Sequence, residues 1–213
     1  MSLSSLSASP DPGGMVYTRH VPNAITVLRV LLTPLVIVLM FSGTFWGITG
    51  ALALFVIAAV SDWIDGKLAR SLKVSSRFGK FLDPLADKIL VLGTFVALTI
   101  LEPAIVPWWA VALIALRDVG VTGLRSWVES RGGSLRTLPI AKAKTTGQLT
   151  FLILMLAVLA LAERADAAGE AAAWLLYDTP VMFVLLLIVV IITLYTGVIY
   201  FVNQEPSEPD AAA

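Results

Sequence analysis

Residues 62–87 read DWIDGKLARSLKVSSRFGKFLDPLAD, and this stretch joins one long apolar run to the next. The runs cover about 47–66 and 81–101, and each is close to the roughly 20 residues that a helix needs to cross a hydrocarbon core. The stretch contains four aspartates, namely Asp62, Asp65, Asp83 and Asp87. Ionisable side chains at membrane depth are costly and usually functional. The stretch therefore predicts a helical hairpin in a membrane, with a functional site near its turn.

The composition of the whole chain is typical of a polytopic membrane protein. Of its 213 residues, 58% are hydrophobic and 14% are charged, whereas a soluble domain has about 45–50% apolar and about 25% charged residues. Because the connections between apolar runs are short, we predict an all-α fold in which six transmembrane helices form one bundle. The six runs lie at about 24–43, 47–66, 81–101, 106–127, 145–162 and 180–202.

The ends of the chain differ in composition from this six-span domain, which we assign to residues 15–203. Residues 1–14 and 204–213 are small, polar and rich in proline, so we expect disordered tails there. The formal net charge is zero, and no nucleic acid is expected as a partner.

The positions of the basic residues predict how the bundle is oriented. Outside the spans, lysine and arginine concentrate in the N-terminal segment and in the connections 67–80 and 125–144. The basic residue in the other connections is Arg164, and their acidic residues are Glu102, Glu163, Asp166, Glu170 and Asp178. The positive-inside rule then places both termini and the aspartates in the cytoplasm. We expect a multi-pass protein of the plasma membrane whose active site faces the cytoplasm.

The spacing of the four aspartates predicts a divalent-metal site. On a helix, Asp62 and Asp65 share a face, and so do Asp83 and Asp87. If the two faces oppose each other, four carboxylates converge, and cations relieve their repulsion. Oxygen ligands suit Mg²⁺ or Mn²⁺, and four aspartates can hold one ion or two. The alternative is that the aspartates cap helix ends or pair with nearby basic residues.

Small and basic residues beside the aspartates favour a diphosphate as the ligand. Gly66 and Ala69 clear side chains from the aspartate face, so that a phosphate-bearing group can approach the backbone. Arg70 adds positive charge, and Ser76 adds a hydroxyl in the same connection. Together these residues predict a metal–diphosphate site at a membrane surface.

The pattern D-x-x-D-G-x-x-A-R-x8-G-x-x-x-D-x-x-x-D over residues 62–87 resembles the signature of the CDP-alcohol phosphotransferase family. Members transfer a phosphate-bearing group from a CDP-linked donor to an alcohol, release CMP and use divalent metal. The resemblance implies a homodimer, two metal ions held by the four aspartates, and Asp87 as the general base. The residues that it assigns to the CDP site are Gly66, Ala69, Arg70 and Ser76.

A second polar group, on the fourth and fifth spans, predicts an acceptor that itself carries a phosphate. Arg117 and Arg125 fall near one helical face, where two guanidinium groups can hold a phosphate. Asp118 can orient one of them, and Lys142 and Lys144 add positive charge at the start of the fifth span. The alternative is an ordinary cluster of basic residues on the cytoplasmic side.

The sequences RDVGVTGLR at 117–125 and KAKTT at 142–146 resemble the phosphatidylglycerophosphate synthase branch of the family. This resemblance implies that glycerol 3-phosphate attacks CDP-diacylglycerol, giving phosphatidylglycerophosphate and CMP in phospholipid biosynthesis. It also implies that the protein is in contact with membrane lipid. Inositol phosphate and phosphatidylglycerol remain open as acceptors. Outside the family, the alternative is a cation transporter that uses the aspartates as a permeation site.

Polar residues also recur along the first span, at Asn23, Thr26 and Arg29. Polar side chains at membrane depth usually face the interior of a bundle. We therefore expect Asn23 and Thr26 either to support the CDP-diacylglycerol pocket or to bond neighbouring helices. Lys88 directly follows Asp87, and we expect it to balance the charge of the aspartates.

Overall fold

The computed structural model describes residues 28–72, 79–130 and 140–202, with side chains described over 28–61, 88–124 and 144–199. The first helix covers Leu28–Met40. The elements that follow are α2 (Phe45–Leu72), α3 (Gly79–Leu101), α4 (Trp108–Ser130), α5 (Ile140–Ala162), α6 (Ala167–Ala173), the π-helical turn η1 (Trp174–Asp178) and α7 (Val181–Val202). All regular structure within these ranges is helical, which confirms the predicted all-α class.

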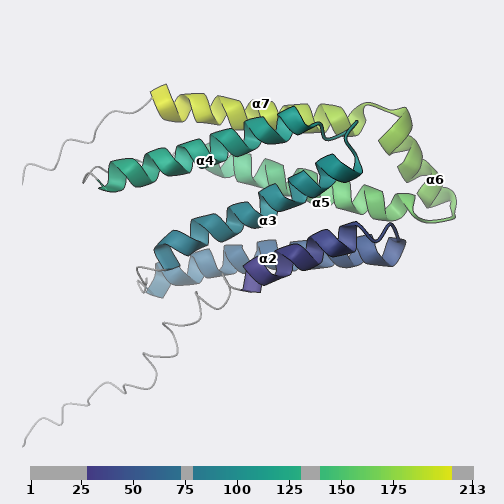
Figure 1. Cartoon of the computed structure of the whole chain (residues 1–213), viewed down its shortest axis with the longest axis horizontal. Coiled ribbons are helices and arrows are strands. Elements are labelled where there is room, and N and C mark those ends of the chain that lie inside the picture. Colours follow the sequence, from purple (N-terminus) through teal and green to yellow (C-terminus); the bar gives the residue numbers. More distant parts are fainter. Residues whose placement is uncertain (1–27, 73–78, 131–139, 203–213) are drawn as a thin grey trace, which may run out of the picture.

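The long helices run side by side and alternate in direction, so that the bundle has two ends (Figure 1). At one end, which we call the α6 end, Tyr177 of η1 donates a 2.9 Å hydrogen bond to Glu102 after α3. The Arg164 guanidinium lies 5.4 Å from the centre of the Phe45 ring at the same end. At the opposite end, which we call the aspartate end, α2 finishes and α3 begins.

Helix α5 lies at the centre of the bundle, where it packs against α2, α3, α6 and α7. Its side chains Leu152, Met155 and Leu156 are fully buried. Phe151 stacks on Phe95 of α3, with ring centres 5.9 Å apart and planes 8° from parallel. Because such interiors are close-packed, this core fixes the spacing of the helices that carry the polar residues nearer the aspartate end.

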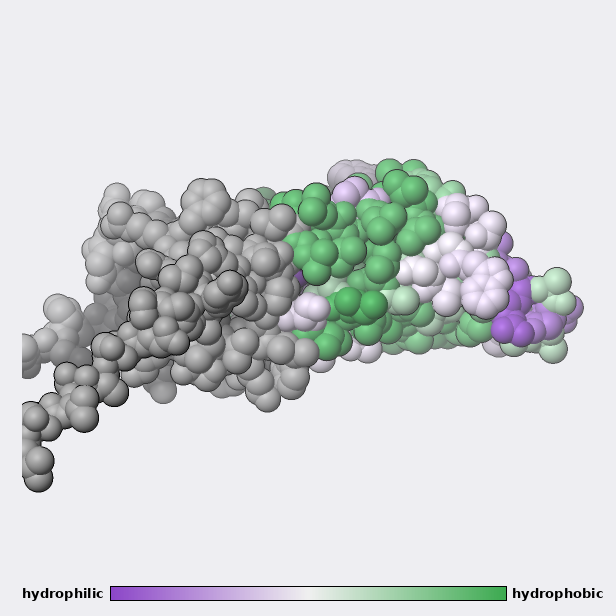
Figure 2. Space-filling view, turned by 90° about the horizontal axis from the view of Figure 1, so that it is seen from below, coloured by the Kyte–Doolittle hydropathy of each residue, from purple (hydrophilic) through white to green (hydrophobic). Residues whose placement is uncertain are grey.

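The face of the bundle seen in Figure 2 carries a broad hydrophobic band that gives way to polar residues at the α6 end. Within the described residues, Lys144–Ala162 and Val181–Ile199 are long and apolar enough to cross a membrane, and three shorter apolar helices accompany them. Each of the six apolar runs of the sequence contains a helix. The chain is thus a helical protein suited to a membrane, while the six-span topology stays a prediction.

Helix α6 and the turn η1 lie between the last two apolar runs, in a segment to which the sequence analysis assigned no helix. The Asp166 side chain caps α6 by accepting a 3.0 Å hydrogen bond from the Gly169 backbone N–H. Aspartate is a favoured N-cap, and five of the seven residues of α6 are alanines, which have high helix propensity. The local signal was therefore present, but it covers a segment too short to stand out beside the apolar runs.

Candidate functional site

A network of polar side chains joins α3, α4, α5 and α7, and its centre is the carboxylate of Asp118, a residue that is 3% exposed. Oδ1 of Asp118 lies 2.5 Å from Nζ of Lys144 and 3.3 Å from Nη1 of Arg117. Oδ2 lies 3.9 Å from Nζ of Lys88. One carboxylate therefore faces three cations, and these four side chains together carry two net positive charges.

The guanidinium of Arg117 also bonds across to α7. Its Nε donates to the backbone carbonyl of Thr193 at 3.1 Å, and its Nη2 donates to Oγ1 of Thr196 at 3.1 Å. Gln148, one turn after Lys144 on α5, donates to Oγ1 of Thr193 at 3.5 Å. Burying charge is tolerated only where the charge is paired and hydrogen-bonded. These contacts supply such partners and fix the arginine side chain in one place.

The prediction that Asp118 orients an arginine agrees with this geometry, and Lys144 joins the same carboxylate. Lys88 reaches the same carboxylate, an ion pair that the sequence did not predict, while its expected role beside Asp83 and Asp87 stays a prediction because those side chains lie outside the described ones. The reason is tertiary: α3 packs against α4, which brings Lys88 to a carboxylate on the neighbouring helix.

The four predicted metal ligands lie on the two helices that flank residues 73–78. Asp62 and Asp65 fall within α2, and Asp83 and Asp87 fall within α3, and the two helices pack against each other. This helical backbone agrees with the spacing argument, and four carboxylates are a donor set that suits a hard divalent cation. Their side chains lie outside the described ones, and elsewhere the described side chains form no group of three or more potential metal ligands.

Several other predicted site residues also lie outside the described side chains. Those with a helical backbone are Gly66, Ala69, Arg70, Arg125 and Lys142. Those outside the described residues altogether are Asn23, Thr26 and Ser76. Arg29 is described and is 3% exposed, as expected for a polar residue that faces the interior of the bundle.

Sequence reasoning missed the part that α7 plays in this network. Thr193 and Thr196 are buried in a helix that is otherwise almost entirely apolar, VMFVLLLIVVIITLYTGVIYFV. Polar residues at membrane depth are usually turned toward partners inside the bundle. The pair of threonines one turn apart was therefore the available signal, although their partner on α4 could not be named from it.

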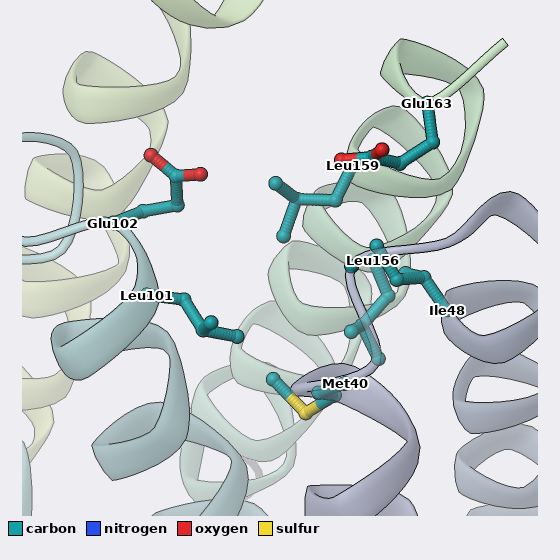
Figure 3. A pocket seen from close by; sticks show the side chains of 8 residues that line it. Met40, Ile48, Leu101, Glu102, Leu156, Leu159 and Glu163 are labelled. Carbon is teal, nitrogen blue, oxygen red and sulfur yellow. The ribbon is translucent and has the colours of Figure 1, made fainter.

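A small pocket of about 70 Å³ lies toward the α6 end, away from the network (Figure 3). Apolar side chains such as Met40 and Leu156 line it, together with the carboxylates of Glu102 and Glu163. Burial raises the pKa of Glu102, the Tyr177 hydrogen bond opposes this shift, and the charge of Glu163 reinforces it. Burial and the contact with Glu102 raise the pKa of Tyr177 to about 12. An apolar and acidic lining is unsuited to a phosphate-bearing substrate.

Comparison with known proteins agrees with the chemistry of the aspartate stretch and the basic network. The family described as CDP-alcohol phosphatidyltransferase matches residues 19–199. The chain is 41% identical over 147 residues to a CDP-diacylglycerol–glycerol-3-phosphate 3-phosphatidyltransferase of Pseudomonas fluorescens, a match that covers 65% of this chain and 72% of that protein. It is 37% identical over 143 residues to the protein of that name in Bacillus subtilis, covering 61% and 72%.

A plant relative extends the comparison. The chain is 34% identical over 149 residues to the chloroplastic/mitochondrial CDP-diacylglycerol–glycerol-3-phosphate 3-phosphatidyltransferase 1 of Arabidopsis thaliana. This match covers 64% of the chain, which spans half the length of the plant protein. The family predicted from residues 62–87 is confirmed, and the chain belongs to the CDP-alcohol phosphatidyltransferase family.

Proposed function

We propose that this chain is an integral-membrane phosphatidyltransferase that transfers the phosphatidyl group of CDP-diacylglycerol to glycerol 3-phosphate, with CMP as the second product. Membership of the family supports the class of reaction, and the names of the bacterial relatives support this donor and acceptor. The choice of acceptor is supported by the net charge of plus two on Asp118 and its three cationic partners. A phosphate monoester carries about −1.5 to −2 charges at pH 7 and therefore matches this site.

Arg117 and Lys144 are the proposed ligands of the acceptor phosphate, with Arg125 and Lys142 as further contacts. Arginine has five N–H donors, and three of those on Arg117 serve Thr193, Asp118 and Thr196. The remaining donors, one on each terminal nitrogen, suit two oxygens of one phosphate group. Lysine contributes a compact point charge to the same group.

The donor site is proposed to lie on the aspartate stretch. Its four aspartates would hold Mg²⁺ or Mn²⁺, two ions by family resemblance, and bound cations would neutralise charge on the diphosphate. The residues proposed to contact CDP-diacylglycerol are Gly66, Ala69, Arg70, Ser76, Asn23 and Thr26. Divalent-metal dependence is general in this family.

Helix α3 connects the donor and acceptor halves of the proposed site. Asp87 would accept the proton of the acceptor hydroxyl as that oxygen attacks phosphorus and the bond to CMP breaks. The next residue, Lys88, lies 3.9 Å from Asp118. The proposed base thus directly precedes a residue that is paired with the centre of the proposed phosphate site, which favours a fixed distance between the attacking hydroxyl and its phosphate.

The proposal includes the surroundings of the enzyme. It places six spans in the plasma membrane, with both termini and the site on the cytoplasmic side, and two copies of the chain in a homodimer. The distribution of basic residues supports this orientation. The apolar helices and the hydrophobic band in Figure 2 support a lipid environment.

The proposal is tested by CMP release from the purified full chain in detergent, with CDP-diacylglycerol, Mg²⁺ and one acceptor at a time. We expect turnover with glycerol 3-phosphate and much less with inositol phosphate or phosphatidylglycerol. Turnover with either of those acceptors alone would overturn the choice of acceptor. Metal flux into vesicles without release of CMP would instead favour the cation transporter.

A further inference from the structure

The hydroxyl of Thr196 on α7 takes part in two hydrogen bonds that together hold Arg117 against this helix. Oγ1 of Thr196 accepts a 3.1 Å hydrogen bond from Nη2 of Arg117 and donates its own proton to the carbonyl of Thr193 at 2.9 Å. That carbonyl also accepts from Nε of Arg117. Because the hydroxyl proton is directed to the carbonyl, an oxygen lone pair is left for the guanidinium.

Gly197 permits this close approach of the arginine to α7. A Cβ atom added at Gly197 would lie 2.9 Å from Cγ and 3.3 Å from Nε of Arg117. These separations are shorter than ordinary contact between such atoms, which is about 3.5–4.0 Å. Any larger residue at position 197 would therefore push the arginine away from the two threonines.

We infer that α7 positions Arg117 for the acceptor phosphate, and that Thr196 and Gly197 are positioning residues that set the affinity for the acceptor. The inference rests on the proposed role of Arg117. An arginine already held in place loses little conformational freedom when the phosphate binds, and its free N–H donors are fixed in direction. Without the α7 contact, the same side chain would keep its charge but lose this preorganisation.

The location of the two residues predicts which kinetic constant they govern. Helix α7 packs against α4 and α5, which carry the proposed acceptor ligands. Of the proposed CDP contacts, Gly66, Ala69 and Arg70 lie on α2, and the proposed base Asp87 lies on α3. Disturbing Thr196 or Gly197 should therefore change the KM for glycerol 3-phosphate and leave the KM for CDP-diacylglycerol within about 2-fold, since an interaction confined to one substrate appears in that substrate's constants.

The test compares Thr196→Val with Thr196→Ser, and Gly197→Ala with Gly120→Ala, by CMP release from the full chain in detergent. Valine keeps the shape of threonine without its hydroxyl, so we expect the acceptor KM to rise about 10-fold, as for the loss of a hydrogen bond to a charged group. Serine keeps the hydroxyl and should restore nearly the wild-type KM. Gly197→Ala should act like Thr196→Val, whereas Gly120→Ala on α4, where an added Cβ meets nothing within 4 Å, should behave as wild type.

An unchanged acceptor KM in Thr196→Val would overturn the inference, as would equal rises in both KM values or failure of serine to rescue. Thr196→Val is decisive if Gly197→Ala unfolds the protein. Arg117→Ala separates this inference from the function on which it rests. If Arg117→Ala raises the acceptor KM but Thr196→Val does not, only the positioning role fails. If Arg117→Ala leaves the acceptor KM unchanged, the proposed role of Arg117 fails as well.

Discussion

Replacing Asp118 by asparagine should destabilise the protein more than removing any one of its cationic partners. Asp118 is the carboxylate to which Lys144, Arg117 and Lys88 are paired. The substitution keeps the size of the side chain and removes its charge. Three cations from three helices then face one another without the carboxylate that lies between them.

The size of the effect follows from how deeply the partners are buried. The side chains of Lys144, Arg117 and Lys88 are 7%, 10% and 18% exposed. Removing one partner of a buried ion pair costs about 3–5 kcal/mol. Because the asparagine oxygen still accepts a hydrogen bond and Lys88 is the most distant and most exposed partner, we expect the free energy of unfolding to fall by about 3 kcal/mol. Lys144→Met leaves Asp118 paired with two cations, so its cost should be only about 1.5 kcal/mol.

The measurement is denaturant unfolding of the full chain in detergent, followed by tryptophan fluorescence, for both single variants and the double variant. The double variant should be less destabilised than the sum of the single ones, because neighbouring groups in one network are coupled. Asp166→Asn is the matched control: it removes an exposed ion pair with Arg164 and keeps a side chain that can cap α6. If Asp118→Asn unfolds at the same denaturant concentration as wild type, or if Lys144→Met is equally destabilising, Asp118 is not the centre of the network.

Three further predictions concern catalysis and pH. Asp87→Asn should lower kcat for CMP release at least about 100-fold in a folded protein, because the acceptor hydroxyl loses its general base; substantial remaining turnover would exclude that role. Arg117→Ala should raise the acceptor KM at least about 10-fold, and Arg117→Lys should recover only part of this because lysine lacks the planar fork; equal effects on both substrates would contradict an acceptor role. Burial raises the pKa of Glu102, the hydrogen bond from Tyr177 opposes this shift, and the nearby charge of Glu163 adds to it. The protonated carboxyl therefore contributes to the stability of the folded protein below the ordinary pKa of a glutamate, and this contribution is lost as pH rises through the raised pKa. Glu102→Gln should therefore gain in melting temperature over wild type as pH rises above the ordinary pKa of a glutamate, and a difference that stays constant as pH rises, or the same trend in the exposed Glu170→Gln control, would count against this account.

The pocket at the α6 end shows how the two ends of the bundle differ in chemistry. Its polar lining is acidic, and the pKa shifts of Glu102 and Tyr177 both reflect burial. The network around Asp118 has an excess of positive charge instead. Among the described side chains, the acidic pocket at the α6 end therefore disfavours an anionic ligand, whereas the network around Asp118 favours one.

The sequence predicted most of the helices and the family because both depend on patterns that are local in the chain. Apolar runs of membrane length form helices wherever they occur, and residues 62–87 carry the whole aspartate pattern within two helix ends and one connection. The short helix α6 escaped prediction for the opposite reason, since seven residues leave little periodic signal. The roles of metal ligand and general base rest on this local pattern and on the family resemblance, and they stay predictions for Asp62, Asp65, Asp83 and Asp87.

The basic network was only partly predictable, because its members meet through packing and not through spacing. Position along the chain suggested Arg117, Lys144 and an orienting role for Asp118, but it did not predict the ion pair between Lys88 and Asp118. The carbonyl that holds Arg117 lies 76 residues further along the chain. By itself the sequence determined the helices, the family and the residues that could carry the chemistry. Only the tertiary structure decided which charges share a partner and that α7 holds the arginine, because those contacts depend on how α3, α4, α5 and α7 pack together.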